Sequence, residues 1–209
     1  MAYSGDISRW ATTFPDSLIP RILHLLLDSW KDFTTNQTKE VPITQEFFVV
    51  LRNNQESSQL PFLIDLEVMY LNEDGTEQQA RLDIRFIHGY RRNVYFSIEC
   101  KRLRVQSPGS FETLAREYVT EGMFRYLTGQ YATDLGKGGM LGYVMDGKTN
   151  QAIDDVRRAI EQRRSDLHMA KDDTLGPCST LSSRQVRQTL HNYGPDNRFL
   201  LYHVFLPIE

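Results

Sequence analysis

Three strand-like runs follow one another between residues 60 and 101, with short polar joints between them. They read LPFLIDLEVMY (60–70), QARLDIRFI (79–87) and NVYFSIECK (93–101). The first joint contains Asp74-Gly75, a pair typical of hairpin turns, and the second joint reads HGYRRN. The spacing therefore predicts a three-stranded meander at the centre of an α/β fold.

Helical patterns flank this meander. Apolar residues recur at helical spacing over 16–33, where Asp16 or Ser17 can cap the helix. We expect a second helix that is capped by Thr44, carries Glu46 in its first turn and ends near residue 54. The elements expected after the meander are a long helix over about 110–131, a short strand at 140–145, a helix over 149–167, a loop over 168–183 and a closing strand, FLLYHVFLP.

The length and composition suit one domain. The chain has 209 residues, of which 40% are hydrophobic, enough to bury a core. We expect one domain over 1–209, with a core at about 43–146, an N-terminal helix over 16–33 and a C-terminal helix and strand over 149–209. No apolar run is long enough for a membrane span, and the N-terminus lacks signal-peptide order, so we expect a cytoplasmic protein without membrane contact.

Charge is unevenly distributed. The net charge of −3 argues against a protein that coats nucleic acid indiscriminately, because such binding rests on many Lys and Arg contacts to phosphates. Residues 81–104 nevertheless hold two acids, Asp83 and Glu99, among seven bases. Those bases are Arg81, Arg85, Arg91, Arg92, Lys101, Arg102 and Arg104. The pattern predicts a locally basic surface around two carboxylates.

An acid and a base end the third run. Glu99 and Lys101 share one face of a strand, because successive side chains alternate, whereas Cys100 is expected in the core. Asp83 interrupts the preceding run in the same way, and a hairpin of even register would set it opposite Glu99. Mg²⁺ is usually coordinated by one or two protein carboxylates, and water and phosphate oxygens fill its remaining positions. If such a site hydrolyses a phosphate ester, Lys101 would hold or deprotonate the attacking water, or neutralise the charge that develops on the phosphate.

The pattern Asp83…Glu99-Cys100-Lys101 resembles the signature of the PD-(D/E)XK nuclease superfamily, which has the restriction-endonuclease-like fold. The resemblance covers about 43–146 as an order of elements: helix, three strands, helix, strand. It implies that Asp83 and Glu99 bind Mg²⁺ or Mn²⁺ and that Lys101 is the catalytic lysine. Some members use an auxiliary acid on the first core helix, which implies such a role for Glu46.

The resemblance also implies substrate contacts beyond the motif. Related nucleases place polar residues of the following helix beside the active site, which makes Tyr118 and Arg125 candidates for substrate binding. Arg102, which directly follows the motif, is a third candidate. The leucine before Asp83 stands where many members have proline. Asp65 and Glu67 are rival carboxylates, and either could be the partner of Glu99 or form a structural ion pair.

These observations together predict a metal-dependent nuclease acting on DNA, in restriction, repair or phage defence, with RNA left open as a substrate. The competing hypothesis is a non-catalytic binding or assembly subunit of the same fold. Presence of all three catalytic residue types favours the enzyme. The chain has no recognisable DNA-reading module, so we expect self-association or a partner protein that supplies targeting.

Overall fold

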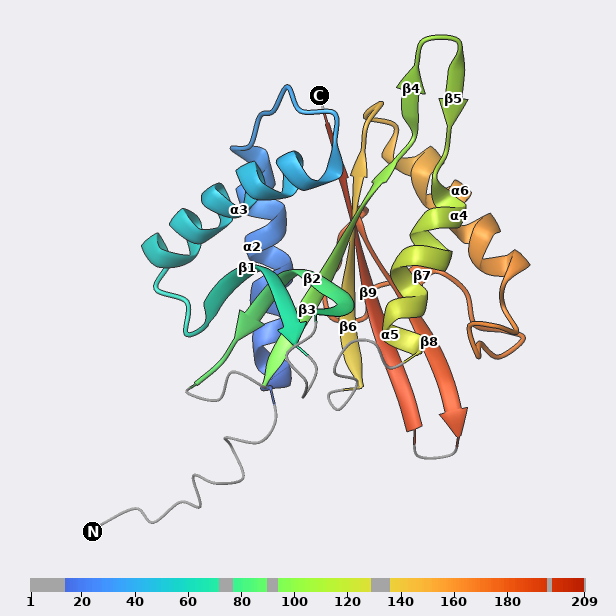
Figure 1. Ribbon diagram of the computed structural model, residues 1–209. Helices are drawn as coiled ribbons and strands as arrows, with labels where there is room; N and C mark the ends of the chain where they lie inside the picture. Colours follow the sequence, from blue (N-terminus) through green and yellow to red (C-terminus); the bar gives the residue numbers. More distant parts are fainter. Residues whose placement is uncertain (1–13, 72–76, 90–93, 129–135, 195–196, 209) are drawn as a thin grey trace.

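The computed structural model describes residues 14–71, 77–89, 94–128, 136–194 and 197–208, and a mixed seven-stranded sheet forms its centre (Figure 1). The strands, in their order across the sheet, are β1 (Leu63–Leu71), β2 (Glu77–Ile87), β3 (Tyr95–Leu103), β6 (Lys137–Val144), β9 (Asn197–Pro207), β8 (Val186–Gly194) and β7 (Gly176–Pro177). The predicted meander is confirmed, because β1, β2 and β3 pair antiparallel. Strands β3, β6 and β9 run parallel, and β8 and β7 continue antiparallel.

Helices cover both faces of the sheet. One face carries η1 (Asp16–Leu18), α2 (Ile19–Lys31) and α3 (Glu40–Ser57). The other carries α6 (Thr149–Gln162) and a broken helix made of α4 (Ala115–Glu117), the π-helical η2 (Tyr118–Met123) and α5 (Phe124–Leu127). The structure is thus mixed α/β, with a hydrophobic cluster on each side of the sheet. No helix among the described residues is both long and apolar enough to cross a membrane.

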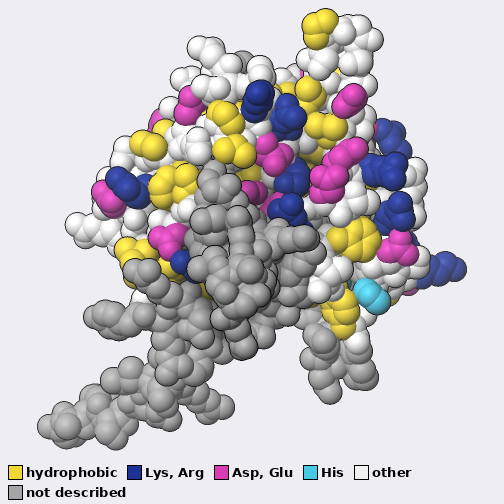
Figure 2. Space-filling model, in the orientation of Figure 1, with side chains coloured by type: hydrophobic (Ala, Val, Ile, Leu, Met, Phe, Trp, Pro, Cys, Tyr) yellow, Lys and Arg dark blue, Asp and Glu magenta, His cyan; other side chains and the backbone are white. Residues whose placement is uncertain are grey.

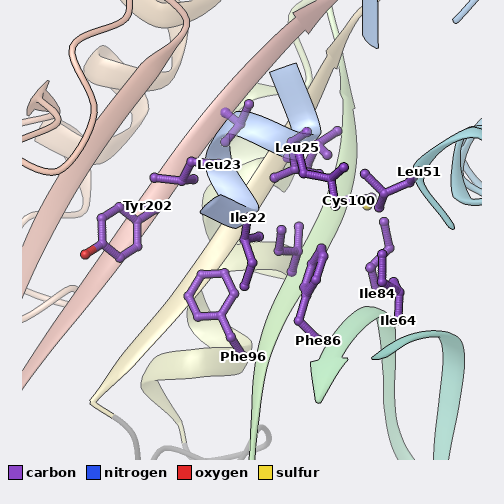
Figure 3. Close-up of a cluster of buried hydrophobic side chains, with 14 of the residues drawn as sticks. Ile22, Leu23, Leu25, Leu51, Ile64, Ile84, Phe86, Phe96, Cys100 and Tyr202 are labelled. Carbon is purple, nitrogen blue, oxygen red and sulfur yellow. The ribbon is translucent and has the colours of Figure 1, made fainter. Parts of the chain in front are cut away.

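The cluster under α2 and α3 fixes how β3 is oriented. Ile22 of α2, Leu51 of α3 and Phe86 of β2 point toward one another, and Cys100 of β3 joins them (Figure 3). Cys100 is fully buried, as the strand alternation predicts, and burial raises the pKa of its thiol well above the ordinary value. Because Cys100 faces this cluster, its neighbours Glu99 and Lys101 face the other way.

Helix α3 begins four residues before its predicted cap. Thr44 lies inside the helix, where its hydroxyl donates to the Glu40 carbonyl oxygen at 2.9 Å. Pro42 is tolerated near the N-terminus because the first amide hydrogens of a helix have no intrahelical acceptor. The earlier start puts Glu40 rather than Glu46 in the first turn.

The predicted start of the long helix at 110 is also wrong. A hairpin of β4 (Val105–Ser107) and β5 (Ser110–Glu112) comes first, and the helix begins at Ala115. Gly109 turns the hairpin with φ of +79°, a conformation that favours glycine. The helix continues to Leu127, and its predicted end at 131 lies outside the described residues.

The C-terminal part extends the sheet further than the sequence suggests. The predicted closing strand is β9, and β8 pairs beside it although its sequence, VRQTLHNYG, has few apolar residues. Its buried positions include Thr189 and His191, which replace the usual apolar side chains. Helix α6 ends at Gln162, five residues before the predicted end, and the expected loop over 168–183 consists of turns, unstructured backbone and the short β7.

Candidate active site

Asp83 and Glu99 lie on neighbouring strands where the β2–β3 ladder ends. The register pairs Ile84 with Ile98, and its next position sets Asp83 opposite Glu99. Opposed residues of an antiparallel pair face the same side of the sheet, so the even register expected from the sequence is confirmed. The Asp83 Oδ2 atom accepts a hydrogen bond from the Cys100 backbone amide at 2.7 Å, which ties the carboxylate to β3.

Lys101 contacts carboxylates from two elements, β3 and α3. Its Nζ lies 2.6 Å from Glu99 Oε1 and 3.1 Å from Oε1 of Glu40, and it also donates to the Cys100 carbonyl oxygen at 2.9 Å. The Lys101 side chain is 12% exposed and that of Glu99 is fully buried. The ammonium is therefore held in place by acceptors from β3 and α3.

Glu40 is a site residue that the sequence analysis missed. Its Oε2 atom accepts the Arg102 backbone amide at 3.0 Å while its Oε1 atom contacts Lys101, so the carboxylate bridges two consecutive residues of β3. Its position follows from the early start of α3. The only signal in the sequence was Pro42, two residues on, which is typical of a first helical turn.

The site concentrates negative charge. Burial, together with the nearby Glu99 carboxylate, raises the pKa of Asp83 to about 7. Burial alone would lower the pKa of Lys101, but the carboxylates of Glu99, Glu40 and Asp83 outweigh it and raise that pKa above its ordinary value. Lys101 is thus an ammonium ion at neutral pH. Acidic and basic side chains are interspersed on the face between α3 and α4 (Figure 2).

Glu46 is not among the residues brought together here. Its Oε2 atom accepts a hydrogen bond from the Thr35 hydroxyl at 2.6 Å and its Oε1 atom accepts one from the Gln37 amide at 2.8 Å. These bonds lower its pKa. Glu46 lies six residues after Glu40 on α3, almost two helical turns further along and on a different side of the helix.

The rival carboxylates are placed differently. Asp65 of β1 pairs with Arg85, whose Nη2 atom lies 2.6 Å from Asp65 Oδ2, so it forms the structural ion pair that the sequence analysis left open. The side chain of Glu67 lies outside the described residues.

Tyr118 is buried rather than available to a substrate. It is fully enclosed, and its hydroxyl lies 3.0 Å from His203 Nδ1. The Thr189 hydroxyl lies 2.9 Å from His203 Nε2 and 2.8 Å from His191 Nε2. The other ring nitrogen, His191 Nδ1, lies 2.7 Å from the Leu167 carbonyl oxygen. This chain satisfies polar groups between the π-helical turn and β8 and β9. Tyr118 is therefore not placed where a substrate could contact it in this structure.

Arg125 and Arg102 hold the site together. Arg125 of α5 places Nη1 2.8 Å from Glu99 Oε1, so this helix reaches the site, while the expected contact of Arg125 with a substrate stays a prediction. Its side chain is 32% exposed, which leaves it in reach of a ligand. Arg102 donates Nη1 to the Thr38 carbonyl oxygen at 2.6 Å and so fixes the segment before α3.

The side chains at this site are of the type that binds a hard divalent cation. Asp83 and Glu99 offer carboxylate oxygens on one face, and burial together with the Glu99 charge raises the pKa of Asp83, a penalty on its charged form that a bound cation relieves. No group of three or more His, Cys, Asp or Glu side chains in the described part of the chain is arranged to hold a metal by itself. A pair of carboxylates matches Mg²⁺, which keeps most of its positions for water and phosphate oxygens.

Comparison with known proteins adds no family to this picture. Neither the protein-family models, nor the curated proteins, nor the solved structures contain a match to the chain.

Proposed function

We propose that the chain is a metal-dependent nuclease that hydrolyses phosphodiester bonds in DNA, with Asp83 and Glu99 as ligands for Mg²⁺ or Mn²⁺. The observation that carries the proposal is the convergence of Asp83, Glu99 and Lys101 at the end of the β2–β3 hairpin. The order α3, β1, β2, β3, broken helix, β6 supports it, because the PD-(D/E)XK core has the same order.

The chain's own residues have separable tasks in this reaction. The chemistry supplied by a bound divalent cation is polarisation of the phosphoryl group and acidification of a water molecule. Lys101, as an ammonium ion, neutralises charge that develops on the phosphate rather than removing a proton, because its pKa is raised. Glu40 and Glu99 position Lys101, and Arg125 holds the Glu99 carboxylate. Glu40 thus takes the auxiliary role first expected for Glu46.

Targeting is proposed to come from a second copy or from a partner protein. The net charge of −3 gives the isolated chain little long-range attraction for DNA. We expect weak binding by a monomer. Restriction, repair and phage defence are all settings for such an enzyme.

One observation favours the competing hypothesis of a non-catalytic subunit. Lys101 and Arg125 already pair with the buried Glu99 carboxylate, as they would in a structural ion-pair network. In that case Asp83 would serve only to accept the Cys100 amide. The two hypotheses differ in the effect of a substitution that removes the Asp83 charge but keeps its hydrogen bond. Only the nuclease hypothesis predicts a loss of DNA cleavage.

A substrate panel tests the proposal. Purified wild-type protein is incubated with supercoiled plasmid, linear duplex DNA, single-stranded DNA and RNA, with Mg²⁺, with Mn²⁺ and with a chelator. We expect cleavage of DNA that requires a metal. Absence of cleavage on every substrate with both metals would overturn the nuclease assignment and favour the binding subunit.

A further inference from the structure

A cavity lined by both polar and apolar residues lies at the β7–β8 edge of the sheet, away from the carboxylates described above. Its volume is about 470 Å³, within the range of about 300–1,000 Å³ typical of small-molecule sites. Arg157, Arg184 and Arg187 line it together with Ser182 and Ser183. The remaining lining residues are Leu175, Pro177, Cys178 and Leu181.

The cavity gathers positive charge without a lining carboxylate. Arg187 donates Nη1 to the carbonyl oxygens of Val186 and Ser183, at 2.9 and 3.2 Å, so its polar contacts leave its charge uncompensated. Arg184 is exposed and forms no ion pair with a carboxylate among the described residues. Only Arg157 has an acidic partner, the exposed Asp154 one turn earlier on α6. Burial, and to a lesser extent the Arg157 charge, lower the pKa of Arg187.

Apolar residues also line the cavity. Leu175 and Cys178 are buried, Leu181 is half-buried and Pro177 is exposed beside them. Guanidinium groups bind phosphate oxygens in a two-pronged geometry, and apolar side chains can pack against the face of a nucleobase. The dianionic charge of a terminal phosphate matches the two arginines that lack an acidic partner, Arg184 and Arg187.

We propose that this cavity binds a nucleotide, with its phosphate on Arg184 and Arg187 and its base against Leu181 and Pro177. The negative charge of the phosphate would offset the positive charges of these arginines, which explains why they converge. The ligand is either a free mononucleotide or the phosphorylated end of a nucleic-acid strand, since both present the same chemistry.

The proposal does not depend on the nuclease assignment. The sheet register sets Glu99 beside Met140, Met140 beside His203 and His203 beside Arg187. Arg187 therefore stands three strands from Glu99 in one row, roughly 14 Å at the usual strand spacing. No residue is shared between the two sites, so each can fail separately.

Calorimetric titration of the full chain tests the proposal with four probes: dAMP, inorganic phosphate, deoxyadenosine and a 5′-phosphorylated trinucleotide. Titration is done with a chelator present, so that the carboxylate site is inactive. We expect dAMP to bind more tightly than phosphate and deoxyadenosine to bind least. Binding of dAMP alone identifies a free nucleotide as the ligand, and binding of the trinucleotide as well identifies a strand end. Equal affinity for phosphate and dAMP would overturn the nucleotide assignment.

Variants locate the binding. Arg184→Gln, an exposed change that keeps the fold, should weaken dAMP binding about tenfold or more, and Arg187→Gln should do the same. Arg21→Gln on α2 is the matched control, because Arg21 is also exposed and the variant loses the same charge. Unchanged affinity in both pocket variants, or an equal loss in Arg21→Gln, would contradict the proposal.

Discussion

Glu40 and Glu46 provide a matched pair on one helix. Glu40 contacts Lys101 and the Arg102 amide, whereas Glu46 bonds to Thr35 and Gln37. We expect Glu40→Gln to lower the DNA cleavage rate about tenfold, because Lys101 loses a charged partner that orients it. Glu46→Gln should stay within about twofold of wild type. Single-turnover cleavage rates measure both, and an equal loss in the two variants would show that the Glu40 contact has no role.

Asp83 and Lys101 should respond oppositely to loss of charge. Asp83→Asn keeps an acceptor for the Cys100 amide and removes repulsion from Glu99, so stability should be unchanged or higher. Lys101→Met leaves the buried Glu99 without one of its cations and should cost about 3–5 kcal/mol of unfolding free energy. Urea denaturation of the two variants tests this. A large loss in Asp83→Asn would argue that its charge is structural.

At the scale of elements, two glycines test how closely the broken helix packs on β6. A methyl group at Gly138 would overlap the Tyr126 ring, with Cδ1 at 2.7 Å. That ring cannot move freely, because its hydroxyl donates to the Ser97 and Gly139 carbonyl oxygens. Gly138→Ala should therefore cost about 1–3 kcal/mol or more.

Gly122→Ala is the comparison. Its methyl group would meet the flexible end of the Met140 side chain, with Sδ at 3.4 Å, and alanine favours the helix by about 1 kcal/mol. We expect a change within about 1 kcal/mol, measured by the same urea denaturation. A greater loss in Gly122→Ala than in Gly138→Ala would mean that the packing of this helix is misread.

The sequence predicted the elements whose local signals agree with their packing. The face of Cys100 followed from strand alternation, and the even β2–β3 register followed from the expectation that Asp83 and Glu99 share a face. The start of α3 was missed because Thr44 is a residue type that commonly caps helices, yet here its hydroxyl bonds to the Glu40 carbonyl oxygen inside a helix that begins at Glu40. Strand β8 was missed because Thr189 and His191 occupy buried positions, where hydrogen bonds to distant residues make them acceptable. No local pattern reports such partners.

For the whole molecule, the buried histidines predict acid sensitivity. Burial lowers the pKa of His203 to about 3 and that of His191 to about 4. Below the ordinary histidine pKa of about 6.5 the unfolded chain binds protons that the folded chain does not, so stability falls as pH falls. Each histidine should contribute a loss of about 2 kcal/mol between pH 7 and 5.

Variants isolate this effect. Asp83 acts in the opposite direction, since its raised pKa favours the folded state as pH falls from 7 toward 4, so wild type alone is ambiguous. His203→Asn should remove about half of the histidine contribution relative to wild type. His24→Gln, on the exposed side of α2, should leave the pH dependence unchanged. Urea denaturation at pH 7 and 5 gives the comparison, and identical pH dependence in all three proteins would contradict the prediction.

The central claim is that the Asp83, Glu99 and Lys101 site cleaves DNA with a divalent metal. The most direct measurement is the cleavage rate of duplex DNA by wild type and by Asp83→Asn, purified in parallel, with Mg²⁺ and with a chelator. Asp83→Asn keeps the hydrogen bond to Cys100 and loses only the charge of one proposed ligand. We predict metal-dependent cleavage by wild type and a loss of at least about a hundredfold in Asp83→Asn at unchanged melting temperature. Equal cleavage by the two proteins, or none by wild type with either Mg²⁺ or Mn²⁺, would contradict the account.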